Sequence, residues 1–126
     1  MDKEDFIEQL HQYYGGDDRT YRHSLARDVL YTPGVQFFAE HCGGGAYWLL
    51  DIIATEPAIR KQAESFASIT LTVTGSVGKL VVDDGGAGDN GERSVVFTRD
   101  FDFTTAFEGE WKFYFVDHTV MLPGEY

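Results

Sequence analysis

The hydrophobic pattern of this 126-residue chain changes its period near residue 66, and this change constrains the fold more than any other feature. Before that point, apolar residues recur every three or four positions, as on one face of a helix. After it they alternate with polar residues, as in strands that are buried on one side. Helices followed by a run of strands are typical of an α+β domain. A chain of this length usually forms one domain, so we expect a single domain over residues 1–126.

Two or three helices are predicted in the first half. The first covers residues 5–14 and ends at Gly15-Gly16. The second begins at Thr32-Pro33, because threonine can cap a helix and proline fits its first turn, and it ends before Gly43. The third covers residues 46–56. Its apolar residues occupy most of its circumference, which indicates a buried central helix.

Four strands are predicted in the second half, over residues 68–74, 79–83, 94–104 and 111–116. The turns between them are short, and Asn90-Gly91 is typical of a hairpin, so we expect antiparallel pairing. Phe97, Phe101 and Phe103 alternate with polar residues and should face the helices. The predicted fold is therefore two or three N-terminal helices packed on a roughly four-stranded antiparallel sheet.

The chain carries 21 acidic and 10 basic residues, which gives a formal net charge of −11 at pH 7. Residues 1–64 contribute −5 and residues 65–126 contribute −6, so the acidity is spread through the fold. A field of this sign repels nucleic acid and attracts basic proteins. We therefore expect a protein partner with a basic surface and no direct nucleic acid binding. Alternatively, the charge only keeps the molecules apart in solution.

Three features of the chain predict a cytoplasmic protein that does not enter a membrane. Cys42 is the only cysteine, which suits a reducing compartment and excludes an intramolecular disulfide. The first five residues are polar and acidic, unlike a signal peptide. The longest mainly apolar stretch, residues 46–54, contains Asp51 and is too short to span a bilayer.

Four segments spread along the chain resemble a known group of proteins when they are taken together. They are Tyr21-Arg22-His23, residues 29–35 (VLYTPGV), residues 46–51 (AYWLLD) and the ending VMLPGEY. The set resembles an uncharacterised family of small proteins encoded by bacteria, phages and plasmids. This resemblance implies a compact stand-alone domain, often carried on mobile elements. It implies no activity and supplies no catalytic residues.

No motif of the sequence meets the requirements of catalysis, cofactor binding or metal binding. Residues 86–91 (GAGDNG) match a dinucleotide-binding glycine pattern, but a strand follows where a helix is needed. The same acidic loop lacks the ligand spacing of a calcium loop. The four histidines are scattered, and Cys42 lies on the apolar stripe of a helix, where we expect a core residue. No catalytic residue, metal site or cofactor is therefore predicted.

Tyr21, Arg22 and His23 form the best polar cluster of the sequence, and Tyr31 and Asp51 are candidates to join it. Arg22 and His23 could recognise an anionic group, with Tyr21 and Tyr31 as the walls of a pocket. Alternatively, the cluster is structural. Asp51 lies in an apolar helix and needs a partner, because an unpaired buried carboxylate is costly. We predict that Arg22 is this partner, with Asp28 as its other possible carboxylate.

The polar face of the predicted sheet is a second candidate surface for a partner. It should contain Thr70, Thr72, Thr98, Asp100, Asp102 and Tyr114. Threonine, aspartate and tyrosine on an open sheet could form a docking surface. The alternative is that threonine occurs there because exposed strands favour it.

These patterns favour a non-catalytic acidic binding module that docks on a basic surface of a host protein. Such a module could be an inhibitor made by a phage or mobile element, for example an anti-CRISPR protein. One alternative is a small enzyme or ligand-binding domain with a pocket around Tyr21, Arg22, His23 and Asp51. Another is a structural protein that self-associates through a sheet edge.

Overall fold

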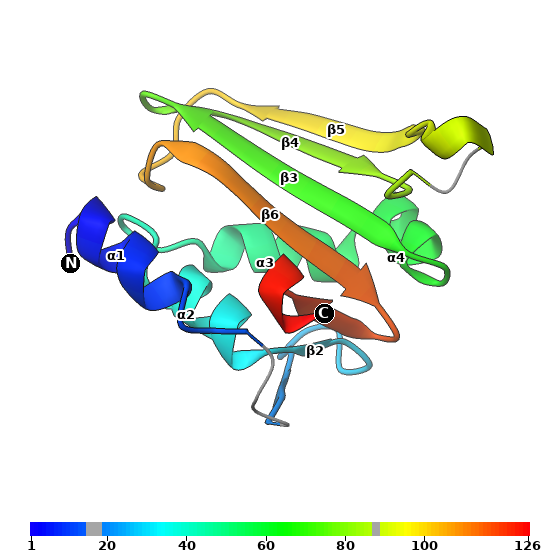
Figure 1. Cartoon of the computed structure of the whole chain (residues 1–126), viewed down its shortest axis with the longest axis horizontal. Helices are drawn as coiled ribbons and strands as arrows, with labels where there is room; N and C mark the ends of the chain where they lie inside the picture. Colours follow the sequence, from blue (N-terminus) through cyan, green and yellow to red (C-terminus); the bar gives the residue numbers. More distant parts are fainter. Residues whose placement is uncertain (15–18, 87–88) are drawn as a thin grey trace.

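The computed structural model describes residues 1–14, 19–86 and 89–126. Four helices and seven strands are found in these ranges (Figure 1). Two short 3-10 turns also occur, at Asp89–Gly91 and Pro123–Glu125. In chain order the helices and strands are α1 (Lys3–Leu10), β1 (Tyr21–Arg22), β2 (Leu30–Tyr31), α2 (Pro33–His41), α3 (Tyr47–Thr55), α4 (Pro57–Ala63), β3 (Ala67–Thr74), β4 (Val77–Asp83), β5 (Val95–Phe101), β6 (Gly109–Val116) and β7 (Thr119–Met121).

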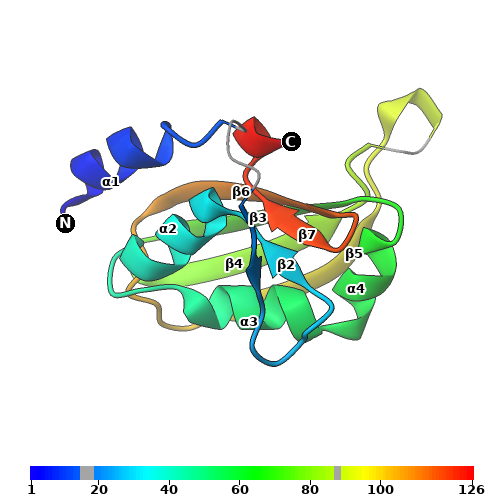
Figure 2. The same ribbon diagram turned by 90° about the horizontal axis from the view of Figure 1, so that it is seen from below.

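All seven strands belong to one mixed sheet with the order β1-β2-β7-β6-β3-β4-β5. Neighbouring strands are antiparallel except β2 and β7, which run parallel. The helices α2, α3 and α4 lie on one side of the sheet (Figures 1 and 2). No helix covers the opposite side of β3, β4, β5 and β6 among the described residues, but Phe66 and Tyr126 pack there against Tyr114. The α+β class is thus confirmed, with helices and sheet in two layers.

The prediction of four antiparallel strands covers only the part of the sheet made by β3, β4, β5 and β6. The strands β1, β2 and β7 have two or three residues each, too few for an alternating pattern to stand out. The parallel pairing of β2 with β7 joins Leu30 to Thr119, two residues far apart in the sequence. The helix α4 was also missed, because its seven residues follow α3 after the single residue Glu56.

The predicted helix boundaries are most accurate where the sequence contains a capping residue. At the start of α2, Thr32 Oγ1 accepts a hydrogen bond from the Val35 N–H at 3.4 Å, as predicted. The first helix is capped by Asp2 but ends at Leu10 rather than at Tyr14. The reason is that the following N–H groups bond three residues back, as that of Tyr13 does to the Leu10 carbonyl, so the helix tightens into turns. The glycines predicted to end it lie outside the described residues.

The core fills the space between the helices and the inner face of the sheet. The ring of Phe6 in α1 lies 5.2–5.7 Å, between centroids, from those of Phe37, Phe38, Phe107 and Trp111. Aromatic contacts of this kind add to the stabilisation from burial alone. They attach the first helix to α2 and to β6.

Three further predictions concern individual core residues. Cys42 is fully buried, as predicted. Phe97 and Phe101 pack against the core, also as predicted. Phe103 does not: 71 % of its surface is exposed, because β5 ends at Phe101 and the alternation ends with it.

The longest helices of the described residues, α2 and α3, have nine residues each. A bilayer core requires about 20 apolar residues in a helix. No helix in the described part of the chain is therefore long and apolar enough to cross a membrane.

Candidate functional site

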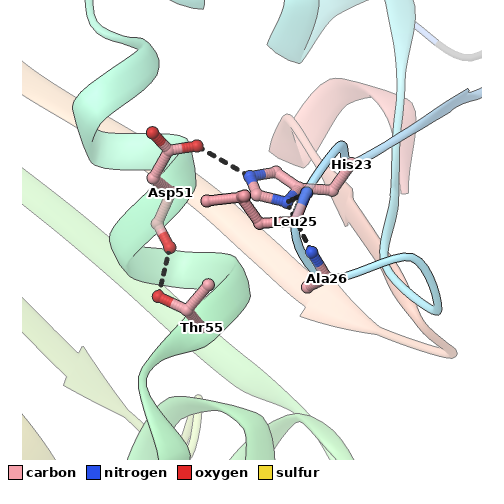
Figure 3. Close-up of polar contacts among 5 residues, drawn as sticks. All are labelled: His23, Leu25, Ala26, Asp51 and Thr55. Atoms are coloured by element: carbon pink, nitrogen blue, oxygen red, sulfur yellow. Dashed lines mark hydrogen bonds and ion pairs between the residues drawn. The ribbon is translucent and has the colours of Figure 1, made fainter.

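His23 connects the loop after β1 to the helix α3 (Figure 3). Its Nδ1 accepts hydrogen bonds from the backbone N–H groups of Leu25 at 3.1 Å and Ala26 at 3.0 Å. The proton of the neutral imidazole is therefore on Nε2, which donates to Asp51 Oδ1 at 2.7 Å. Because both ring nitrogens are used, His23 has no nitrogen left to accept a proton from a substrate.

The partner of Asp51 is His23, and the predicted pairing with Arg22 is wrong. Neighbouring residues of an extended chain point to opposite sides. His23 is therefore directed to α3 and is buried, whereas Arg22 is exposed and donates a hydrogen bond to the Arg27 carbonyl. Asp28, the other carboxylate considered for Arg22, pairs with Arg60 of α4. The polar cluster is thus divided between two sides of the chain.

Tyr21 and Tyr31 stand opposite each other on β1 and β2, and their rings stack at 5.6 Å between centroids. Nearby, Tyr47 at the start of α3 donates its hydroxyl to Glu40 Oε1 near the end of α2, at 3.2 Å. The elements β1, β2, α2 and α3 lie together on the near side of the molecule in Figure 2. We call this region the tyrosine–acid surface and define it as Tyr13, Tyr21, Tyr31, Tyr47, Glu40 and Asp51.

Burial is the main cause of the raised pKa values of three tyrosines at the tyrosine–acid surface, and nearby carboxylates add to it. Burial and the nearby Glu40 carboxylate raise the pKa of Tyr31, and they raise the pKa of Tyr47 to about 12. For Tyr13, burial and Glu125 raise the pKa, and Tyr21 and Glu40 add to the effect. Burial disfavours a charge of either sign, so only the contribution of the nearby carboxylates favours a positive charge here.

In the described part of the chain, neither carboxylate of this surface forms an ion pair with lysine or arginine. Among the described residues, the only ion pair of Glu40 is with His41 Nε2 at 3.6 Å, and that of Asp51 is with His23. The side chains of Glu40 and Asp51 are 44 % and 50 % exposed, so both face solvent. The surface therefore offers aromatic rings and available negative charge together.

The second predicted surface, the outer face of the sheet, carries charges of both signs. Lys79 lies between Thr72 and Asp100, and Lys112 stands beside Thr70. Lys112 also pairs with Glu110 at 3.5 Å. Each of these lysines therefore lies next to an acidic residue, Lys79 next to Asp100 and Lys112 next to Glu110. A basic partner would gain less here than at the tyrosine–acid surface.

The other predicted members of this face are placed as follows. Thr98 stands opposite Val81 on β4 and is exposed. Asp102 is exposed beyond the end of β5. Tyr114 is half-buried, because its ring packs 4.9 Å from Phe66 and 5.4 Å from Tyr126. The five residues within strands share the outer face of the sheet, but they are spread over β3, β5 and β6 and do not converge on one point.

A cavity of about 840 Å³ lies beside α4 and the turn between β6 and β7, and none of the predicted site residues lines it. Sequence reasoning did not point to it. Arg60, Lys61 and His118 line it together with acidic side chains such as Asp28 and Asp117, so its lining selects neither anions nor cations. In the described part of the chain, no three His, Cys, Asp or Glu side chains are placed to hold a metal ion.

Sequence reasoning also missed Glu40, Tyr13 and Tyr47 as members of a site. The signal was weak: Glu40 and Tyr47 are separated by the glycine run of residues 43–45, which folds α3 back beside α2. The Tyr47 hydroxyl reaches the Glu40 carboxylate only because α3 folds back in this way.

Comparison with known proteins gives one match. A family model described as "Family of unknown function (DUF6876)" matches residues 4–126. No curated protein matches the chain, and no solved structure does. The expectation of an uncharacterised family is confirmed, while a bacterial, phage or plasmid origin remains an expectation.

Proposed function

The chain belongs to the DUF6876 family of unknown function, and we propose that it is a non-catalytic acidic binding module that docks on a basic surface of another protein. The observation that carries this proposal is the tyrosine–acid surface. There, Tyr47 donates a hydrogen bond to Glu40, and the Glu40 carboxylate also acts on Tyr13 and Tyr31. Neither Glu40 nor Asp51 has a lysine or arginine partner among the described residues.

The chemistry of this surface suits lysine and arginine side chains of a partner. Tyrosine provides a large, rigid contact area and loses little conformational entropy on binding. Its ring face attracts a cation, and a carboxylate nearby adds an ion pair that brings specificity. The net charge of −11 would speed the approach of a basic partner through long-range attraction.

A small enzyme or ligand-binding domain around Tyr21, Arg22, His23 and Asp51 has less support. His23 uses both nitrogens within the protein, and Arg22 lies on the other side of the strand from it. The cavity of about 840 Å³ is lined by other residues. The binding proposal does not require His23, Arg22 or the cavity to be available to a ligand.

The proposal extends to an inhibitor encoded by a phage or another mobile element, such as an anti-CRISPR protein. Proteins that bind nucleic acid present basic surfaces to phosphate groups. An acidic module in the cytoplasm can compete for such a surface without binding nucleic acid itself. This part rests on the charge and on the sequence resemblance.

The test uses the immobilised protein and a bacterial lysate, with three forms of the protein compared. Wild type should retain a basic protein at low salt and release it at about 1 M salt, where charges are screened beyond about 3 Å. Glu40→Gln combined with Tyr31→Ala should lose this partner. Glu110→Gln removes one charge from the outer sheet face and serves as the control for net charge.

Two results would contradict the proposal. One is that no basic protein is retained, or that its retention ignores salt. The other is that Glu110→Gln weakens retention as much as the double variant, since the effect would then come from the overall field and not from the tyrosine–acid surface.

A further inference from the structure

The strand β5 forms one edge of the sheet, and among the described residues no strand pairs with its outer side. Figure 1 shows it along the rim of the sheet, with α4 beneath its first part. An edge strand presents unpaired backbone N–H and C=O groups, to which another extended chain can add. Exposed apolar residues occur at the two ends of this strand, Val95 and Val96 at its start and Phe103 just beyond its end, whereas Thr98, Arg99 and Asp100 between them are polar and exposed.

A groove of about 230 Å³ lies where β5 ends, lined by Trp48, Phe101, Phe103, Thr104 and Thr105. Trp48 of α3 packs edge-on against Phe101 at 4.9 Å between centroids, so the floor of the groove is fixed. Phe103 stands beside it with 71 % of its surface in solvent. The backbone edge and the groove are thus adjacent, one suited to hydrogen bonds and the other to an apolar side chain.

We infer that the edge of β5 binds an extended basic segment of another protein by strand addition, and that an apolar side chain of this segment enters the groove beside Phe103. In this mode of recognition the backbone provides affinity and side-chain pockets provide specificity. The inference concerns a different surface from the tyrosine–acid surface and does not depend on it.

Charge determines which segment fits this edge. Asp100 and Asp102 are exposed at the end of β5, and neither forms an ion pair among the described residues, although Asp100 stands opposite Lys79 of β4. Lysines on the outer side of an added strand would stand beside them. Arg99 points to the helix side, where its guanidinium lies 5.3 Å from the centre of the Phe101 ring, so the added strand should be apolar on that side.

A second copy of the chain is a poorer occupant. Each copy carries a net charge of −11, and β5 of the second copy would bring its own Asp100 and Asp102 to the same edge. Charged residues on an edge strand are a common means of preventing pairing between copies. A basic segment turns the same charges into an attraction.

The test is a titration of the whole protein with a capped hexapeptide in which lysine alternates with valine. Followed by NMR, the backbone amides of β5 and the indole N–H of Trp48 should shift in a saturable way at about 1 mM peptide. The β5 amides on the outer side should also exchange more slowly with solvent. Phe103→Ser should weaken binding about tenfold, as truncation of an aromatic anchor does. Its side chain is exposed, so this variant should fold.

Two controls separate strand addition from charge alone and from the proposed function. A peptide of equal charge with proline in place of its central valine cannot complete the ladder and should bind weakly. Glu40→Gln should bind the alternating peptide as wild type does. The inference would be overturned if the proline peptide shifted the β5 amide resonances as much as the alternating peptide does, or if neither peptide shifted them. It would also be overturned if light scattering showed a dimer of the wild type and a monomer of Phe103→Ser, because the occupant of the edge would then be a second copy of the chain.

Discussion

Replacing His23 tests whether the loop after β1 is held to α3 mainly by Nδ1 or by Nε2 of this buried ring. In His23→Ala, the N–H of Ala26 loses its acceptor in a buried place, whereas the N–H of Leu25 is better placed to reach water. An unsatisfied buried N–H costs about 1–3 kcal/mol, and the lost bond to Asp51 about 1 kcal/mol more. We therefore expect a loss of about 2–4 kcal/mol, a large part of the 5–15 kcal/mol of a typical domain.

Replacing His23 with asparagine or glutamine shows how much of this loss of stability belongs to each ring nitrogen. The oxygen of His23→Asn can take the place of Nδ1 and accept from the loop, while His23→Gln reaches toward Asp51 instead. Asp51 is half exposed, so water can replace its partner, but the N–H of Ala26 is buried. The free energy of unfolding should fall in the order wild type, Asn, Gln, Ala.

Urea denaturation of the four proteins measures this order, with equal slopes showing that the unfolded states are alike. Asp51→Asn should lower the free energy of unfolding by no more than about 1 kcal/mol, because the half-exposed carboxylate contributes little beyond its hydrogen bond to His23. If the Gln variant is more stable than the Asn variant, the bond to Asp51 is the main contribution, and the account of the loop is wrong.

Four further predictions follow from other parts of the structure. The raised pKa of Tyr47, about 12, means that the folded state holds this proton more tightly than the unfolded state, whose pKa is near 10.0. Stability should therefore be full below pH 10, fall as pH rises from 10 toward 12, and fall less steeply in Tyr47→Phe. Burial raises the pKa of Cys42 to about 11, so iodoacetamide should label the buried thiol only at the rate of unfolding, and rapid labelling without denaturant would contradict this. Gly43→Ala should cost about 3 kcal/mol or more, because its new Cβ would lie 1.8 Å from the Thr105 carbonyl oxygen. Gly75→Ala is the control, since φ is nearly the same but no atom lies within 4 Å, and about 1–2 kcal/mol of backbone strain is expected. Finally, about 0.1 M salt should raise the melting temperature at pH 7 by screening the net charge of −11, and a fall would show that paired charges dominate.

The sequence by itself determined those elements whose signals are local. Thr32 and Pro33 predicted the start of α2, because a capping oxygen acts on an N–H only three residues away. The alternation of residues 68–74 and 111–116 predicted β3 and β6, because a long strand with one buried face needs that pattern. The pattern in Phe97 and Phe101 likewise gave the inner face of β5.

Only the tertiary structure decided the short strands and the sites. Two residues such as Leu30 and Tyr31 become a strand because β7 lies beside them, and no local period records that pairing. The choice of His23 over Arg22 for Asp51 depends on which side of the chain faces α3. The tyrosine–acid surface arises where the end of α2, the start of α3 and β1 meet. Contacts between distant segments are fixed by how the layers pack, and a short stretch of sequence carries no signal for them.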